Sequence, residues 1–387
     1  MATTEKAVVL LSGGLDSCSI LGMAGQLVKD GVITNRHLAS YTLACSHPDG
    51  DERAYVNEAT AMWGFDAYSL NVDDVAEESL VDNVRRFQDF PDPSLWQELN
   101  VLASRHGSRV TLVGDGGDEW LAGDMAHCAD LLRQLRIPAL IRQFRQDVAQ
   151  DRAWDWTGRE DRPPFRQFMQ WCIKPLIPSP LISAARRMLR RNAAPSWISP
   201  DFARAVGLQD RLMRPKKSPR FPTITQQRTH ALLDNGNIVV GREIADRENA
   251  RKSMEGRQPF HDRRLIEFAL ALPEDQRWRG DQTKYVLRQA LQRQLPDSIR
   301  WRRTKADFSF LVTESLARES AGNGFQPLRL AEAGYVDAGE VRAMYDEWLR
   351  GKMSHTWNLW MILASERWLD TAFAALAPRA GDRHERS

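Results

Sequence analysis

Residues 7 to 128 alternate between short apolar runs and amphipathic stretches, several of which end on glycine. The apolar runs AVVLL, HLASYTLAC and RVTLVG have the length of buried strands, and the stretches between them, such as DERAYVNEATAMWG, predict helices. Strands that follow one another through helices form parallel sheets covered on both faces. We therefore predict an α/β fold with a parallel sheet, followed by a mainly helical region.

The first turn after a strand carries the groups expected of a phosphate-binding loop, namely Leu11, Ser12, Gly13, Gly14, Asp16 and Ser17. Glycines let the backbone approach a phosphate chain, and the N–H groups of the turn and the helix start point at the anion. Asp16 would repel a bare phosphate, so its presence indicates Mg²⁺ between the two. The alternative is a tight strand-to-helix connection in which Asp16 and Ser17 cap the helix.

This turn has no lysine of the kind that holds the β and γ phosphates in a Walker loop. Its absence favours chemistry at the α phosphate of ATP, with pyrophosphate as the leaving group.

A second glycine turn, VGDGGDEW, follows a later strand and contains Gly114, Asp115 and Asp118. Ligands of parallel sheets bind at the carboxyl ends of strands, so both turns can lie in one crevice. Asp118 would then share Mg²⁺ with Asp16, and Asp115 would face a substrate amine. The alternative is a glycine–aspartate sequence that only reverses the chain.

The length of 387 residues suggests more than one structural unit. We predict a nucleotide-binding α/β core in residues 1–128 and a helical, Pro- and Arg-rich substrate region in residues 129–240. A helical segment is predicted for residues 241–320. Further helices and a frayed tail are predicted for residues 321–387.

Composition limits the classes of binding partner and the cellular compartment that we expect for this protein. The net charge of +2 gives no case for nucleic acid or an anionic membrane as a partner, and no apolar stretch is long enough to span a bilayer. The four cysteines form no C-x-x-C pair and the eight histidines form no H-x-x-x-H pair, so we predict no metal site built from them. Cys18 is expected to be a small buried residue, and the chain is expected to be cytoplasmic.

Several stretches resemble one enzyme family and occur in its order. SGGLDS is the signature of the PP-loop ATP pyrophosphatases, and GDGGDE follows it. EGRQPFHDRRLIEFALALP resembles a segment with the pattern E-x-R-x-P-F-x-D, while GDQTKYVLRQAL and LPDSIRWRRTKADFSF resemble two lysine-bearing stretches. Over roughly residues 7 to 312 the chain thus resembles the synthetase domain shared by asparagine synthetases, β-lactam synthetases and lasso peptide cyclases. The resemblance implies an adenine nucleotide α-hydrolase-like core.

The resemblance also implies a mechanism with ATP and Mg²⁺ as cofactors. A carboxylate attacks the α phosphate to give an acyl-adenylate and pyrophosphate, and an amine then displaces AMP. By motif position, Lys305 would neutralise charge developing on phosphorus and Lys284 would hold phosphate. Asp115 stands where asparagine synthetases carry a glutamate and β-lactam synthetases a tyrosine. Glu248 falls near the glutamate that partners that tyrosine.

Structural interpretations stand beside these roles. Lys284 and Lys305 lie in arginine-rich stretches that could form solvated faces. Arg257 and Asp262 could form an ion pair that only supports the fold. The histidines are interpreted as non-metal residues, with His261 near the site.

The chain departs from glutamine-dependent members of the family, which begin with a catalytic cysteine, because residue 2 is alanine. We therefore expect no glutaminase domain. The middle region, with WLAG and PSWISPDF, resembles lasso peptide cyclases, so closure of a macrolactam is the first expectation and ammonia-dependent asparagine formation the second. The expected partners are a peptide or amino-acid carboxylate and an amine, with a separate precursor-binding or N-terminal-domain protein as a further candidate. The alternatives from other classes are a PP-loop enzyme that modifies tRNA and a non-catalytic scaffold.

Overall fold

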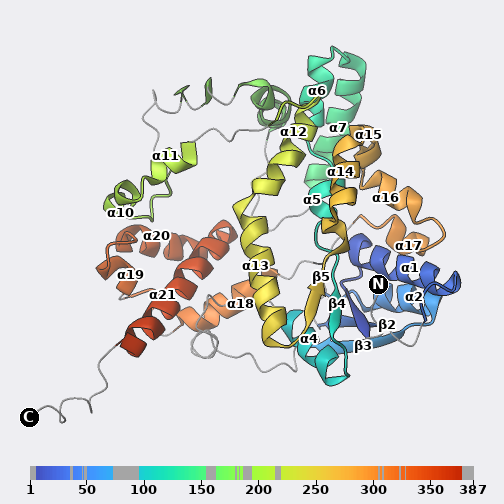
Figure 1. The fold of residues 1–387 in the computed structure, drawn as a ribbon. Coiled ribbons are helices and arrows are strands. Elements are labelled where there is room, and N and C mark those ends of the chain that lie inside the picture. Colours follow the sequence, from blue (N-terminus) through green and yellow to red (C-terminus); the bar gives the residue numbers. More distant parts are fainter. Residues whose placement is uncertain are drawn as a thin grey trace, which may run out of the picture.

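The computed structural model describes residues 6–34, 38–45, 47, 50–72, 96–153, 163–178, 181–182, 184–185, 194–213, 219–303, 306, 309–321, 324–326 and 328–376. One parallel sheet forms the centre, and many helices surround it and extend away from it (Figure 1). This arrangement confirms the predicted α/β fold with a helical region. The sheet consists of β1 (Ala7–Leu11), β2 (Leu38–Ala44), β3 (Asp66–Asn71), β4 (Val110–Leu112) and β5 (Glu255–Arg257).

The strand order β3-β2-β1-β4-β5 places a switch point beside the first strand. The chain builds outward from β1 through β2 to β3, then returns to the other side of β1 to form β4, and every pairing is parallel. Val8 of β1 is in register with Thr111 of β4. In open sheets of this kind the ligand crevice lies outside the carboxyl ends of the strands at the switch point. Both glycine turns follow strands that meet there.

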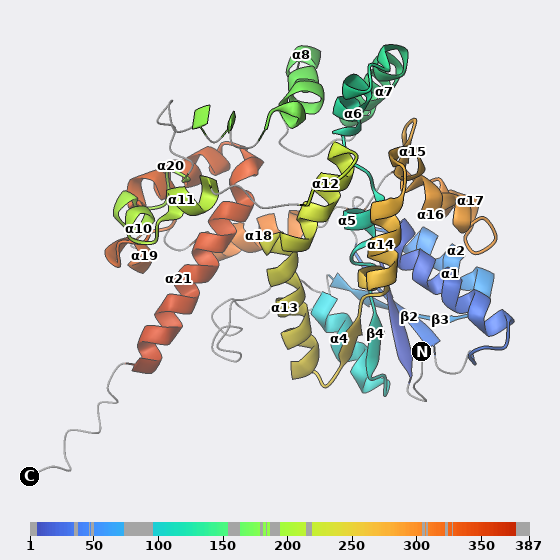
Figure 2. The ribbon, with the colours of Figure 1, turned by 45° about the horizontal axis from the view of Figure 1, so that its top comes forward.

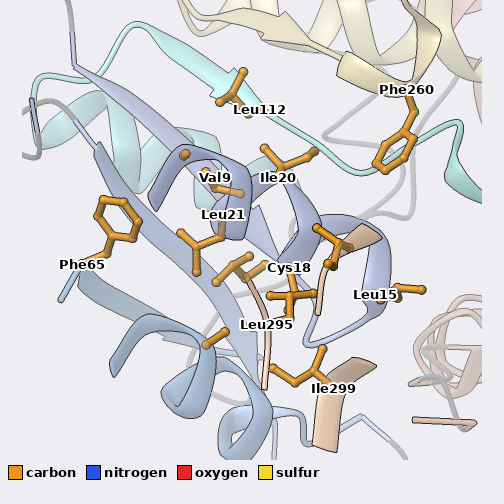
Figure 3. Packing of buried hydrophobic residues seen from close by; sticks show 14 of the residues in the cluster. Val9, Leu15, Cys18, Ile20, Leu21, Phe65, Leu112, Phe260, Leu295 and Ile299 are labelled. Atoms are coloured by element: carbon orange, nitrogen blue, oxygen red, sulfur yellow. The ribbon is translucent and has the colours of Figure 1, made fainter. Parts of the chain in front are cut away.

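The alternation of β1 residues between two faces divides the core. Val9 and Leu11 pack with α1 (Leu15–Lys29) and α2 (Arg53–Trp63), whereas Val8 and Leu10 face α4 (Trp96–Arg105). Figure 3 shows the first of these clusters, with Cys18 of α1 inside it. Apolar residues on both faces of a strand are typical of a fully covered parallel sheet.

The fifth strand lies in a stretch whose sequence predicts only helices. Three residues, Glu-Gly-Arg, carry no apolar periodicity, and β5 forms because it pairs with β4. The N–H of Glu255 donates to the carbonyl of Arg109 at 2.8 Å, and that of Val113 donates to the carbonyl of Arg257 at 3.1 Å. Long-range pairing rather than local propensity thus decides this element.

The described part of the chain between β4 and β5 forms the following helices. They are α5 (Gly117–Leu121), α6 (His127–Arg133), α7 (Ile137–Ala153), α8 (Pro164–Phe168), a π-helix (Met169–Ile173), a 3₁₀ turn (Lys174–Leu176), α10 (Pro200–Ala205), α11 (Leu208–Met213), α12 (Ile224–Ala231), a second 3₁₀ turn (Leu232–Asp234) and α13 (Gly236–Arg251). Both views place α13 between the sheet and the C-terminal helices (Figures 1 and 2).

After β5 the described chain is almost entirely helical. It forms a 3₁₀ turn (Pro259–His261), α14 (Arg263–Ala271), α15 (Glu274–Arg277), a hairpin of β6 (Trp278–Arg279) and β7 (Gln282–Thr283), α16 (Tyr285–Ala290), α17 (Asp297–Arg300), α18 (Ser309–Ser320), α19 (Arg329–Glu332), α20 (Ala338–Leu349), a 3₁₀ turn (Met353–His355) and α21 (Thr356–Leu376). Elements α18 to α21 share an apolar core of their own that includes Leu316, Val341 and Leu359. Within the described ranges, no helix combines the length and the apolar character needed to cross a bilayer.

Candidate active site

The two glycine turns interlock at the switch point. A β-carbon on Gly117 would overlap the carboxylate of Asp16, and one on Gly114 would lie 2.7 Å from the backbone nitrogen of Ser17. Glycine is therefore required at both positions because the first turn occupies the space that a side chain would take. The predicted crevice shared by the two turns is present in the structure.

Two serines at the ends of the first turn hydrogen-bond to each other and fix its shape. The backbone N–H of Ser12 donates to Oγ of Ser17 at 3.1 Å, and the two hydroxyl oxygens are also 3.1 Å apart. Helix α1 begins after Gly14, which makes no side-chain cap. Asp16 and Ser17 thus lie inside the first turn of α1 instead of capping it, contrary to the structural alternative.

Lys284 joins the two turns electrostatically. Its Nζ lies 2.5 Å from Oδ2 of Asp16 and 2.6 Å from Oδ1 of Asp118. The lysine comes from the end of the β6–β7 hairpin and has φ of 54°, a left-handed conformation that is uncommon for a residue other than glycine. Such strain costs about 1–3 kcal/mol and clusters at functional sites.

The same geometry tests whether the site fits a divalent cation. The oxygens of Asp16 and Asp118 converge on the Lys284 ammonium, so one cation already contacts both carboxylates. Carboxylate oxygens are the ligands that Mg²⁺ prefers. The donor set therefore fits the predicted ion, and the ammonium indicates where positive charge is stabilised.

A buried ion pair supports the back of the first turn. Arg302 Nη1 lies 2.6 Å from Oε1 of Glu52 and donates to the carbonyl oxygen of Gly13 at 3.1 Å. Its guanidinium stacks on Tyr55, 4.0 Å from the ring centroid. Gly13 has φ of 65°, and a β-carbon there would lie 2.8 Å from Cβ of Glu52. Glu52 and Arg302 therefore form a clamp that holds Gly13 on the side away from the cleft.

Arg288 holds the chain that carries Arg302. The Arg288 side chain is buried and donates to the backbone carbonyls of Arg300 at 2.6 Å and Arg302 at 3.0 Å. It also donates to Thr283, next to Lys284, at 2.7 Å. Burial lowers the pKa of Arg288. One guanidinium thus fixes both cationic segments of the site.

A cleft of about 700 Å³ opens in front of these groups. On the sheet side it is lined by Ser12, Gly14, Asp16, Ser17, Gly114, Asp115, Asp118, Lys284, Arg302 and Arg303. Leu11 does not line it; this residue ends β1 with its side chain in the core. Most residues of the two turns that the sequence predicts as ligands therefore do face one cavity.

Helix α13 forms the opposite wall. The residues that it contributes recur at helical spacing and include Val239, Arg242, Glu243, Asp246 and Asn249. Asn249 is tied to α4 because its Oδ1 accepts a hydrogen bond of 2.7 Å from the Asn100 amide, and Oδ1 of Asn100 in turn accepts one of 2.9 Å from the Thr111 hydroxyl of β4. This wall is not among the predicted site residues, although the helical spacing of its polar residues is a signal that could have indicated it.

Gly13 is likewise not among the cleft-lining residues, and Glu248 and Lys305 are two further predicted residues that the structure does not place in the cleft. Glu248 is buried, forms ion pairs with Arg251 and Lys252, and is not among the cleft-lining residues, so the structure does not bring it to Asp115. Other residues of α13, among them Asp246 and Asn249, line the cleft instead. Lys305 lies outside the described residues, and its role stays a prediction.

The remaining candidates near the site have structural surroundings. Cys18 is fully buried, and burial raises the pKa of its thiol to about 12, which makes it unreactive at neutral pH. Asp262 begins α14, accepts a hydrogen bond from the Arg264 backbone and pairs with its side chain. Arg257 pairs with Glu255. These contacts replace the expected Arg257–Asp262 pair.

Comparison with known proteins agrees with the site. The family profile of asparagine synthase matches residues 1–370. The chain belongs to the asparagine synthase family. This membership confirms the resemblance of the motifs and associates the chain with ATP-dependent carbon–nitrogen ligases in general.

Two fungal proteins share part of the sequence of this asparagine synthase family member. Amidase chyE of Penicillium rubens is 28% identical over 154 residues, which cover 35% of this chain and 23% of the relative. Amidase chry2 of Gibberella zeae is 28% identical over 138 residues, covering 33% and 21%. The chain thus matches less than a quarter of the length of either relative.

Proposed function

We propose that this chain is an ATP-dependent, AMP-forming amide ligase that adenylates a carboxylate and couples it to an amine. The observation that carries the proposal is the Lys284 bridge between Asp16 and Asp118 at the switch point. Two carboxylates, a cation and a glycine turn rich in N–H donors suit the pyrophosphate half of ATP. Family membership supports the same chemistry.

The neutral donors of the first turn and the cation on a separate hairpin favour attack at the α phosphate. The first turn supplies backbone donors and the Ser12 and Ser17 hydroxyls, while Lys284 reaches the site from a separate hairpin. When bound, Mg²⁺ would be held by Asp16 and Asp118 and would neutralise charge on the leaving pyrophosphate. The clamp of Glu52 and Arg302 keeps the turn in place, so that donors need not reorganise during the reaction.

Asp115 is the candidate for the amine half-reaction. It is exposed, lines the cleft and belongs to the same turn as Asp118. An amine is mostly protonated near neutral pH, so it must lose a proton before it attacks the adenylate. A carboxylate at this position can accept that proton or orient the amine.

We propose a peptide or amino-acid side-chain carboxylate as the substrate. The most specific form of this proposal is closure of a lasso-type macrolactam. The wall formed by α13 carries charges of both signs, from Arg242, Glu243 and Asp246, as suits a zwitterionic or peptidic ligand. The printed name amidase of the two fungal relatives is consistent with chemistry at an amide bond. Ammonia-dependent formation of asparagine is the alternative.

The decisive assay measures nucleotide products with a panel of carboxylic acids and amines. We expect AMP and pyrophosphate, and no ADP, when a suitable acid is present. A peptide with a free N-terminus and a side-chain carboxylate should give a cyclic product that is lighter by one water, whereas aspartate with ammonia should give asparagine under the alternative. Formation of AMP only when tRNA is added would reject the proposal in favour of tRNA modification, and a chain that binds no ATP would reject it in favour of a scaffold.

A further inference from the structure

A second cluster of reactive side chains lies outside the cleft, in the helical region above the sheet. His127 and Cys128 begin α6, Asp147 lies in α7, and Cys172 lies in the π-helix. All four side chains are buried, with exposed fractions of 6% for His127 and 0% for each of the others. These residues take no part in the proposed reaction, and they lie outside the family motifs described above.

Three of the four groups converge on one point, and Cys172 lies beside them. The potential ligand atoms of His127, Cys128 and Asp147 all lie within 4.8 Å of one another. Nε2 of His127 is 2.7 Å from Oδ2 of Asp147, and the Cys128 thiol donates to the same oxygen at 3.3 Å. The side chain of Cys172 lies next to the Cys128 thiol, and the two thiols interact electrostatically. Three separate segments thus direct one nitrogen, two sulfurs and one oxygen inward.

We propose that His127, Cys128, Asp147 and Cys172 form a closed structural site for a divalent cation of the zinc type. Four-coordinate sites built from cysteine, histidine and carboxylate ligands are typical of Zn²⁺, and thiolate with imidazole favours zinc over magnesium or calcium. A buried carboxylate beside two thiols needs a positive partner if the thiols ionise, and the cation supplies it. Because the protein provides four ligands and the cluster is closed to solvent, the ion would be structural and not catalytic.

The surroundings support a metal site in two further ways. Gln143 donates to the other oxygen of Asp147 at 2.7 Å and to the carbonyl of Gly280 at 3.0 Å, so it orients the carboxylate with Oδ2 toward the cluster. Such outer-shell contacts usually accompany metal ligands. Cys172 lies in a π-helix, a rare element that occurs frequently at functional sites.

The position of the cluster gives the ion a role. It joins α6, α7 and the π-helix, which otherwise share a small apolar core that includes Leu140, Val148 and Trp171. His127 also packs edge-on against Trp278 of the β6–β7 hairpin, with ring centroids 5.2 Å apart. That hairpin leads to Lys284, so the bound ion would brace the segment that carries the cation of the cleft.

The test begins with the wild-type chain. Elemental analysis of protein purified under reducing conditions without a metal-affinity step should find one zinc per chain. After chelation, titration with Co²⁺ should produce a thiolate charge-transfer band that saturates at one equivalent and disappears when Zn²⁺ is added. A folded chain that contains no zinc and shows no such band would overturn the proposal.

Variants separate the site from general effects on folding. Cys172→Ser should lose the charge-transfer band or weaken it severely, while Cys45→Ser, a change at a buried cysteine after β2, should retain the full band. Gln143→Met keeps all four ligands and should weaken metal affinity by about 10- to 100-fold. Equal affinity in the wild type and Gln143→Met, with an unchanged band in Cys172→Ser, would contradict the assignment. A mass lower by two hydrogens in the reduced preparation, with a bond between Cys128 and Cys172, would also contradict it.

Discussion

The carboxylate of Asp16 lies against the α-carbon of Gly117, so closely that a β-carbon there would overlap it. Asp16 belongs to the turn after β1 and Gly117 to the turn after β4, on neighbouring strands. This contact makes the two turns one site, because neither can move without displacing the other. Each carries one of the two carboxylates that contact Lys284.

Gly117→Ala should therefore damage the site more than an ordinary glycine substitution. Overpacking of a tight interior costs about 1–3 kcal/mol, and here the displaced group is the Asp16 carboxylate itself. We expect a lower free energy of unfolding and a loss of Mg²⁺-dependent ATP binding, measured by denaturant titration and calorimetry. Gly236→Ala is the matched control, since a β-carbon at Gly236 meets nothing within 4 Å. Equal behaviour of the two variants would show that the contact is unimportant.

The Glu52–Arg302 pair should contribute strongly to stability. Glu52 is 2% exposed, and removing one partner of a buried pair typically costs about 3–5 kcal/mol because the other charge stays buried. Glu52→Ala should show a loss of this size in the free energy of unfolding. The control pair is Arg263 with Glu267, at 88% and 59% side-chain exposure. Glu267→Ala should cost no more than about 1 kcal/mol. An equally small loss of unfolding free energy in both variants would show that the Glu52–Arg302 pair does not stabilise the first turn.

Asp115 should separate the two half-reactions. If it serves the amine, Asp115→Asn should retain carboxylate-dependent pyrophosphate exchange and lose amide product, because asparagine cannot accept the proton. Asparagine takes the same turn conformations as aspartate, so the fold should be preserved. Both assays are run on one preparation, with ammonia and with a peptide that has a free N-terminus. Equal loss in both half-reactions would place Asp115 with the nucleotide, and full activity in both would leave it a turn former.

His261 should titrate at an unusually low pH. Burial, followed by the nearby charge of Arg242, lowers its pKa below the usual 6.5. The unfolded chain therefore binds the extra proton first, so this residue's contribution to stability is present above pH 6.5 and declines as the pH falls toward its folded pKa. NMR titration should show a lowered pKa for His261 in the wild type. In Arg242→Gln this pKa should move part of the way back toward 6.5. Arg247→Gln, a nearby change on α13, should leave it unchanged; a wild-type pKa at or above 6.5 would contradict this assignment.

The sequence was sufficient for the parts of the fold that local patterns determine. Apolar runs and glycine turns predict β1, β2, β4 and the crevice between them, because strand and helix periods differ. The edge strand β5 was not predictable from its three residues, since its pairing with β4 depends on a partner far along the chain.

The candidate site divides in the same way. Asp16 and Asp118 could be predicted as a pair from two turns at one sheet edge. The placement of Glu248 away from the cleft, in ion pairs with Arg251 and Lys252, depends on how α13 is rotated, which no local pattern determines. The cluster of His127, Cys128, Asp147 and Cys172 escapes any spacing rule, because its members come from three elements.

Lys284 is proposed to act with Asp16 and Asp118 on the pyrophosphate of ATP during adenylation. The most direct measurement is carboxylate-dependent exchange of labelled pyrophosphate into ATP by the wild type and by Lys284→Met. We expect exchange in the wild type and a loss of about 10²–10³-fold in the variant, the size expected when one preorganised charge-stabilising donor is removed. Lys352→Met, which breaks a surface pair with Glu347, should exchange normally. Normal exchange in Lys284→Met would contradict this role of Lys284, and no exchange by the wild type with any acid would contradict the proposed adenylation.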